Sequence, residues 1–155
     1  MDNKQKTIKK IGTELIEKLG LEAKVSVSLS KDDFYEVVVE GEDLGILIGY
    51  HGDTLNAFQQ IFGLMVYKSL DEWVNIICDV SGYRAEREKK IEEIVQNAVQ
   101  RSRFLQKPVE LLTMPAFERR IVHTLVAKMQ GVVSESMGEG YARHVVIKPS
   151  QEDVK

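Results

Sequence analysis

Cysteine is almost absent from this sequence of 155 residues, and the long apolar runs of membrane proteins are missing. The single cysteine, Cys78, excludes an internal disulfide and leaves a zinc site without a second thiol. No apolar run approaches the length of a membrane span, and residues 1–6 lack the apolar segment of a signal peptide. We therefore expect a cytoplasmic protein that does not insert into a membrane, with Cys78 in a core strand.

Sequence signatures of catalysis are missing as well. The chain has no Walker phosphate loop, no Gly-x-Ser-x-Gly motif, no Cys/His cluster with metal-ligand spacing and no acidic pair of evident catalytic spacing. Because neither a nucleophile nor a metal site is evident, we expect no enzyme activity, no catalytic residues, no bound metal and no cofactor.

An overall excess of positive charge, which is typical of nucleic-acid-binding proteins, is also lacking. The net charge is −3, but residues 1–80 hold 8 Lys and Arg against 14 Asp and Glu, whereas residues 81–155 hold 13 against 10. An acidic first half still allows a local loop and a helix terminus to attract phosphate, with modest affinity and strong salt dependence. The change in charge predicts a domain boundary at Ser81-Gly82. The predicted parts are a first domain at residues 1–80, a second at 82–149 and a polar tail at 150–155.

The first half of the chain contains clear helical and strand patterns. Apolar residues recur at helical spacing up to Gly20, and strict alternation from Lys24 to Ser30 followed by a β-branched run predicts an antiparallel hairpin. Three strands whose one apolar face is covered by helices make a two-layer α+β domain. The predicted elements are helix 3–19, strands 24–30 and 34–40, a short helix 42–48, a helix that follows a glycine loop and runs to about residue 68, and strand 73–80.

Residues 46–55 contain the most informative pattern, in which Gly49 and Gly52 enclose Tyr50 and His51 between two predicted helices. Because the glycines have no side chains, a phosphodiester backbone can come very near the loop. The free amide groups at the start of the following helix carry partial positive charge that attracts an anion. A phosphodiester fits these features, so one interpretation is a nucleic-acid-binding loop in which Tyr50 and His51 hydrogen-bond the strand. The alternative is a plain helix-helix turn with a glycine at the helix end.

Residues on both sides of this loop have predicted roles too. Asp53 and Thr54 are candidate caps of the following helix, because their side chains accept hydrogen bonds from free amides. Ile46, Ile48 and Leu55 would offer apolar surface to bases. Ordinary core packing is the alternative for these three residues, and the sequence leaves that choice open.

The second half of the chain predicts another α+β domain, in the order helix, strand, helix, strand, strand. Pro108 ends the connection after the first helix, and Pro115 lies in the first turn of the next one. The predicted elements are helix 83–105, strand 109–113, helix 115–130 and strands 131–136 and 142–147.

A second candidate site lies on the later of these two helices. Arg119 and His123 are four positions apart and therefore share a helix face. The planar guanidinium of Arg119 can clamp a phosphate, and His123 can donate to the same anion. A solvated helix edge is the alternative, and we assign Arg120 to solvent. The predicted core face beside them consists of Phe117, Ile121, Leu125 and Met129.

The last strand is expected to extend this basic group. Arg143 and Lys148 would continue a basic strip, so both are included in the second site. His144 alternates with Arg143 along the strand and therefore points to the other face. We assign His144 a structural role.

The two halves resemble two known nucleic-acid-binding modules. The first, with residues 48–52 joining its two later helices, resembles a bacterial type II KH domain over residues 1–80. The second resembles the R-three-H domain, which is named for an Arg and a His with three residues between them. The matching segments are residues 119–123, 134–136, 138–140 and 143–147. A KH domain followed by an R-three-H domain is the arrangement of the bacterial Jag family.

This resemblance implies a protein that binds single-stranded RNA, with single-stranded DNA as a related ligand. It also implies a role as a post-transcriptional or cell-envelope growth regulator, and it leaves open pairing as a homodimer or with a partner KH protein. The chain departs from the family in two ways. Many KH loops carry Lys or Arg between the glycines, where this chain has Tyr50 and His51, and longer Jag proteins carry an extra N-terminal domain that nothing here matches.

Two functions of other classes stay open at this point. The first is a protein-interaction adaptor that binds RNA only incidentally, through the N-terminal amphipathic helix or by self-association. The second is an enzyme of phosphate-ester chemistry that uses Arg119 and His123. A nuclease assay with and without added metal separates catalysis from binding, and we expect no turnover.

Overall fold

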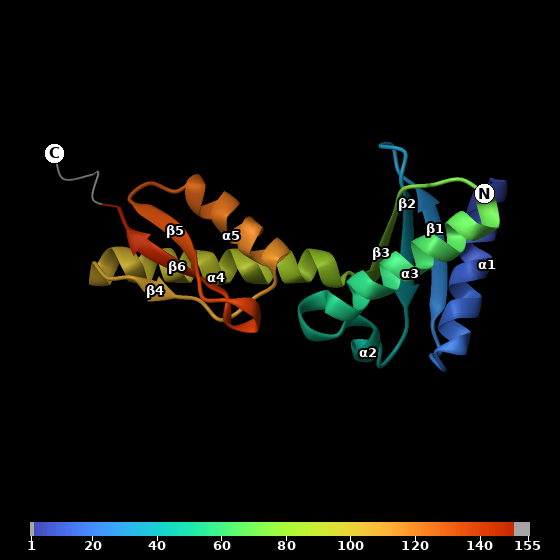
Figure 1. Ribbon diagram of the computed structural model, residues 1–155, viewed down its shortest axis with the longest axis horizontal. Coiled ribbons are helices and arrows are strands. Elements are labelled where there is room, and N and C mark those ends of the chain that lie inside the picture. The colour runs from blue at the N-terminus through green and yellow to red at the C-terminus, as the bar shows by residue number, and fades with distance from the viewer. Residues whose placement is uncertain (1, 151–155) are drawn as a thin grey trace. The chain divides into compact units, whose positions relative to one another are not determined.

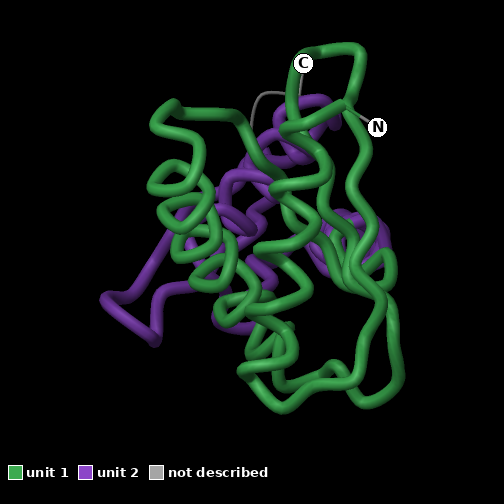
Figure 2. Tube along the Cα trace, turned by 90° about the vertical axis from the view of Figure 1, so that its right-hand side faces the viewer, with its two compact units in different colours: residues 1–84 green, residues 85–155 purple. Residues whose placement is uncertain are grey.

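The chain divides into two units, residues 1–84 and residues 85–155, which Figure 2 distinguishes by colour. A computed structural model describes residues 2–150. Apart from Ser150, the predicted polar tail at residues 150–155 lies outside the described residues.

The first unit is a three-stranded sheet with helices on one face (Figure 1). Strand β2 lies between its neighbours, antiparallel to β1 and parallel to β3. The elements are α1 (Asn3–Lys18), β1 (Lys24–Leu29), β2 (Tyr35–Glu40), α2 (Gly45–Ile48), the 3-10 turn η1 (Tyr50–Gly52), α3 (Asp53–Leu70) and β3 (Ile76–Val80). The predicted hairpin and the predicted two-layer α+β fold are confirmed.

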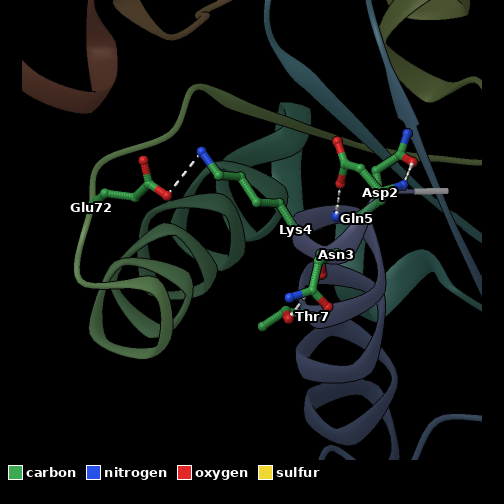
Figure 3. Close-up of polar contacts among 6 residues, drawn as sticks. All are labelled: Asp2, Asn3, Lys4, Gln5, Thr7 and Glu72. Atoms are coloured by element: carbon green, nitrogen blue, oxygen red, sulfur yellow. Dashed lines mark hydrogen bonds and ion pairs between the residues drawn. The ribbon is translucent and has the colours of Figure 1, made fainter.

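Helix α1 begins with a capping box, which Figure 3 shows. The Asp2 carboxylate accepts a hydrogen bond from the Gln5 amide at 2.6 Å, and the Gln5 side chain accepts one from the Asp2 amide at 2.9 Å. These bonds satisfy amide groups that have no partner inside the helix. Lys4 also pairs with Glu72 across 2.9 Å, but both side chains are exposed and the pair contributes little stability.

The core of the first unit follows from strand alternation. Every second residue of the hairpin points inward, where α1 and α3 supply Ile8, Ile16, Phe62 and Val66. Cys78 is fully buried in this core, as predicted. Burial disfavours its thiolate and raises the pKa of Cys78 to about 12.

Arg84 ties α3 to β3 in the same unit. Its guanidinium donates to the Cys78 carbonyl at 2.8 Å and to the side-chain oxygens of Asn56 and Gln59, each at 3.2 Å. Gln59 in turn accepts a hydrogen bond from the Cys78 amide at 2.8 Å. These bonds connect the N-terminal half of α3, which follows η1, with β3.

The second unit is also a two-layer α+β structure (Figure 1). Strand β6 lies between β4 and β5 and is antiparallel to both. Helices α4 and α5 cover the sheet face that carries Val145 and Ile147. The elements are α4 (Tyr83–Leu105), β4 (Val109–Glu110), α5 (Ala116–Ala127), β5 (Val132–Met137), the 3-10 turn η2 (Gly140–Ala142) and β6 (His144–Pro149), and the first two residues of α4 belong to the first unit.

Several predicted boundaries in the first unit are wrong. Strand β3 begins at Ile76 and not at residue 73, because Asp71 adopts a positive φ of 55° that ends α3, and Trp73 stacks on Tyr67 with ring centroids 4.4 Å apart. Helix α2 begins at Gly45 and not at residue 42, because Asp43 also has a positive φ. The cap of α3 is Gly52, which has no side chain to accept a hydrogen bond, so the predicted caps Asp53 and Thr54 are wrong.

Boundaries in the second unit differ as well. Strand β4 ends at Glu110, and α5 ends at Ala127, about three residues before its predicted end. Pro115 is the N-cap of α5 and precedes its first turn. Strand β6 begins at His144, because the preceding residues form η2. Arg143 therefore precedes the strand on which it was predicted.

The buried face of α5 is formed by residues that each lie one position after a predicted core residue. Glu118, Val122 and Val126 are buried, whereas Phe117 is 37% exposed. The other predicted core residues, Ile121, Leu125 and Met129, are only partly buried. The prediction failed because it assumed an apolar residue at every core position, and here a carboxylate occupies one.

We expect the buried thiol of Cys78 to make the first unit less stable in alkali. Its pKa of about 12 lies above the ordinary value of 9.0, so folding favours the protonated form. This stabilisation is complete below pH 9 and is lost as the pH rises toward 12, by about 1.4 kcal/mol at pH 10. Urea unfolding followed by Trp73 fluorescence should show this loss in the parent and not in a Cys78→Val variant. Equal losses in both proteins would contradict the assignment.

Candidate nucleic-acid interface

Positive φ angles shape the glycine loop between α2 and α3. Gly49, His51 and Gly52 have φ of 70°, 51° and 85°, in the region that side chains disfavour. A Cβ atom on Gly49 would lie 2.1 Å from Oγ1 of Thr54, and one on Gly52 would lie 3.1 Å from the ring of Tyr83. The turn itself and its packing therefore require both glycines. Thr54 and Tyr83 occupy the space where side chains at Gly49 and Gly52 would lie, so this space is not available to a ligand.

The surface of the loop is formed by the two residues between the glycines. Tyr50 is 63% exposed, and its ring stacks on the imidazole of His51 at a centroid distance of 3.9 Å. Helix α3 starts directly after Gly52 without a side-chain cap, so its first amide groups have no side-chain acceptor there. Asp53 in this first turn carries negative charge that opposes a bound phosphate.

The apolar candidates beside the loop differ in exposure. Ile46 is 73% exposed, whereas Leu55 is fully buried. Ile48 is half-buried and packs against the core. Helix α2 directs Leu47 inward, which leaves the preceding Ile46 on the outside. Ile46 is therefore available to a base, and Leu55 is a core residue.

In the second unit, Arg119 and His123 each make contacts within the protein. Nη1 of Arg119 donates to the carbonyl of Met114 at 2.7 Å. Nδ1 of His123 lies 2.7 Å from the hydroxyl of Ser134, and Nε2 lies 2.8 Å from that of Ser136. A neutral imidazole donates from one nitrogen and accepts at the other, and a serine hydroxyl can serve either. His123 therefore joins α5 to β5 through both of its nitrogens.

Arg143 lies at the same end of the sheet as Arg119. The Met114 amide donates to the Arg143 carbonyl at 3.4 Å, so Met114 contacts both arginines. Arg143 is exposed, and no carboxylate within residues 2–150 pairs with its guanidinium. Arg120 is also exposed, as expected for a solvated residue.

Lys148 belongs to the opposite face of this sheet. Ser134 and Ser136 point toward α5, so the alternating residue Glu135 points away from it. Lys148 forms an ion pair with Glu135, and His144 on the same face lies 3.7 Å from Glu110. The structure therefore places Arg119 and His123 on one face, links Arg143 to Arg119 through the backbone of Met114, and separates Lys148 from them.

Comparison with known proteins places both units in known families. Residues 5–77 match the KhpA/KhpB KH domain, and residues 86–149 match the R-three-H domain. The chain belongs to the Jag family of KH and R-three-H proteins.

Similar proteins include three that are named RNA-binding protein KhpB. The protein from Clostridium symbiosum is 34% identical over 117 residues, which cover 76% of this chain and 53% of the relative. The one from Bacillus subtilis (strain 168) is 30% identical over 111 residues, which cover 70% of this chain and 53% of that relative. The one from Lactiplantibacillus plantarum (strain ATCC BAA-793 / NCIMB 8826 / WCFS1) is 32% identical over 103 residues, which cover 66% of this chain and 32% of that relative. The chain thus spans about half the length, or less, of the curated relatives it matches.

Two further observations concern the kind of site present. Among residues 2–150, no group of three or more His, Cys, Asp or Glu side chains is placed to hold a metal ion. None of the described helices has the length and apolar character needed to cross a membrane.

The R-three-H domain contains an ion pair that sequence reasoning missed. Glu118 is fully buried, and its two carboxylate oxygens accept from Nε and Nη2 of Arg87 at 2.7 and 2.9 Å. This bidentate pair joins α4 to the first turn of α5, directly before Arg119. A signal existed, because residues 118, 122 and 126 repeat at helical spacing and place a carboxylate on the apolar stripe.

We expect Glu118→Ala to destabilise the R-three-H domain by about 3–5 kcal/mol, because it leaves the Arg87 guanidinium without its buried partner. Glu92→Ala, which removes an exposed carboxylate from α4, should change stability by less than about 0.5 kcal/mol. Urea unfolding followed by circular dichroism measures both. Replacing both partners, with Arg87→Met and Glu118→Leu, should recover most of the loss, since no charge is then left unpaired. Equal effects of Glu118→Ala and Glu92→Ala would show that the pair contributes nothing.

Proposed function

We propose that this chain binds single-stranded RNA, with its KH loop (residues 49–52) and its R-three-H site (Arg119, His123 and Arg143) each holding a short segment. The observation that carries the proposal is the KH loop, where the exposed Tyr50 lies beside the uncapped start of an 18-residue helix. Relatives named RNA-binding protein KhpB support the same class of ligand. Single-stranded DNA shares the phosphates and bases on which this binding depends. We place the two modules at residues 1–80 and 82–149.

At the KH loop, binding would rely on dipoles more than on full charges. The first amides of α3 point their partial positive charge toward a phosphate, and Tyr50 and His51 add a hydroxyl and an imidazole. Ile46 offers an apolar surface to a neighbouring base. Residues 1–80 have a net charge of −6, so we expect modest affinity.

At the R-three-H site, we assign phosphate binding to Arg119 and Arg143. A guanidinium carries five N–H donors, and one of those on Arg119 is used by Met114. His123 belongs to the site as the residue that holds α5 on β5 and so positions Arg119. We place Lys148 outside this site, because it lies on the other sheet face with Glu135 as its ion-pair partner.

Binding is favoured over phosphate-ester chemistry by the contacts of His123. Both of its ring nitrogens make hydrogen bonds within the protein that hold α5 on β5, so the structure gives His123 a positioning role. On the resemblance to the Jag family alone, we further propose a role in post-transcriptional regulation linked to cell-envelope growth. Crosslinking to cellular RNA followed by sequencing tests that role.

A second candidate function is association with another KH domain, as a homodimer or with a partner KH protein. The observation that favours it is an exposed apolar surface on α3 and the segment before β3, where Ile61, Leu64 and Trp73 are 55%, 58% and 67% exposed. Sedimentation of the parent and of a Leu64→Asp variant tests this proposal, because the added charge should lower the associated fraction. Two purely monomeric proteins would contradict homodimer formation.

We expect the double variant Tyr50→Asp, His51→Asp to weaken single-stranded RNA binding by about tenfold or more, because two added charges repel phosphate at the start of α3. Tyr50 is exposed, and Asp tolerates the positive φ of His51, so folding should be preserved. A substitution of Gly52 would be less informative, since it would disturb the packing of Tyr83. Fluorescence anisotropy with a labelled strand measures the change.

The matched control for this variant is Lys6→Gln with Lys9→Gln. It removes two positive charges from the exposed face of α1 and so changes the net charge equally. We expect a much smaller loss of affinity from this control. Equal losses would mean that only net charge matters and that the loop is a plain turn.

The parent protein should bind single strands with a clear salt dependence. A site that contacts only a few phosphates releases few counterions, so we expect a slope of log K against log salt of about −2 to −4 in total. Titrations at several salt concentrations measure the slope. Equal or tighter binding to a duplex of the same length would contradict single-strand selectivity.

A further inference from the structure

The turn between β5 and β6 exposes one aromatic side chain completely. Tyr141 lies in η2 with a relative exposure of 102%, so no other described residue covers its ring. The turn has a defined shape, because the Ala142 amide donates to the Glu139 carbonyl at 3.1 Å. A Cβ atom on Gly138 would lie 2.7 Å from the Ala142 carbonyl oxygen, which shows how closely the turn packs on itself. The ring of Tyr141 is thus an exposed aromatic surface on a turn of defined backbone shape.

This turn is joined to the start of α5 at the R-three-H site. Arg143 follows Tyr141 by two residues, and its carbonyl accepts the Met114 amide at 3.4 Å. The Met114 carbonyl accepts Nη1 of Arg119 at 2.7 Å. Arg119, Tyr141 and Arg143 are therefore close to one another at one end of the domain, linked through the backbone of Met114.

Near Tyr141 the two cations Arg119 and Arg143 outnumber the one exposed carboxylate, Glu139, which favours an anionic ligand. Glu139 is the acidic residue of the turn itself, and the nearby Glu118 is buried and paired with Arg87. Arg143 has no carboxylate partner within the described residues. A single exposed ring between cations and glycines is less typical of a protein interface, whose centre usually buries several apolar side chains.

We propose that Tyr141 is a base-stacking platform of the R-three-H site. An unpaired base lies on the phenol ring while Arg119 and Arg143 hold the adjoining phosphates. Aromatic side chains stack on bases of any sequence, whereas guanidinium groups bind phosphate bidentately. This inference rests on the proposed function. It extends that function by assigning to one end of the site a contact with bases in addition to phosphates.

The first test compares three substitutions by titration with a short single-stranded oligouridylate. Stacking on one base predicts that Tyr141→Ala lowers affinity about five- to tenfold. It should leave the salt slope unchanged, since a base contact releases no counterions. Arg143→Gln should lower affinity and make the salt slope shallower by about 0.7, the value for one phosphate contact with a single strand. Tyr141→Phe should bind like the parent because it keeps the ring.

Phe104→Ala provides the matched control for loss of an exposed aromatic residue. Phe104 is 88% exposed near the end of α4 in the same unit, and we assign it no contact with the strand. Its removal should leave affinity unchanged. All titrations are repeated in the Tyr50→Asp, His51→Asp background, so that the remaining binding reports on the R-three-H domain.

The second test removes the bases and keeps the phosphates. An abasic strand should bind equally to the parent and to Tyr141→Ala. A Tyr141→Trp variant in a Trp73→Phe background has one tryptophan, and its fluorescence should be quenched by oligouridylate and not by the abasic strand. If Tyr141→Ala weakens both strands equally, or weakens neither, the stacking assignment is overturned.

The outcomes also separate this inference from the proposed function. If Arg143→Gln weakens binding while Tyr141→Ala has no effect, the protein binds RNA without stacking on Tyr141, and only this inference fails. If the parent binds no single-stranded RNA, the proposed function fails with it.

Discussion

Positive backbone φ angles at two turns are the constraint on which both candidate sites depend. In the KH domain, Gly49 and Gly52 allow the chain to leave α2 and enter α3 across only four residues. In the R-three-H domain, Gly138 and Gly140 allow the reversal that presents Tyr141 before β6. Side chains at such positions are strained, and at Gly49 and Gly138 they would also collide with neighbouring atoms, so the backbone explains these glycines whether or not a ligand binds. At the KH loop the exposed residues lie directly between the glycines, and in the R-three-H domain Tyr141 follows Gly140 directly.

The two domains offer a nucleic acid different chemistry. The KH loop provides backbone amides, a phenol and an imidazole within an acidic domain, so its attraction for phosphate comes mainly from helix α3. The R-three-H site provides two guanidinium groups, whose charge is permanent and whose donors are arranged in a plane. Neighbouring groups weaken the attraction for phosphate at both sites. The negative charge of Asp53 opposes an anion at the KH loop, and the Met114 carbonyl accepts a hydrogen bond from one donor of Arg119. For the proposed binding, we therefore expect modest affinity at each site.

Much of the fold was predictable because it depends on local periodicity. The hairpin of β1 and β2, the helices α1 and α4 and the order of elements in both domains follow from apolar spacing and turn residues. Boundaries were predictable only to within a few residues where a single residue of positive φ limits an element, as Asp43 does before α2 and Asp71 does after α3. The buried face of α5 was mispredicted because Glu118 contacts Arg87, which is distant in the sequence.

By itself, the sequence determined the two α+β domains, the burial of Cys78 and the placement of Arg119 and His123 on one helix face, because each depends on spacing within one segment. Only the tertiary structure decided which neighbours these residues contact. It placed Thr54 and Tyr83 against the two glycines, Ser134 and Ser136 on His123, and Lys148 on the far face of the sheet. These contacts join residues from different elements, and the packing of helices on strands determines which of them meet.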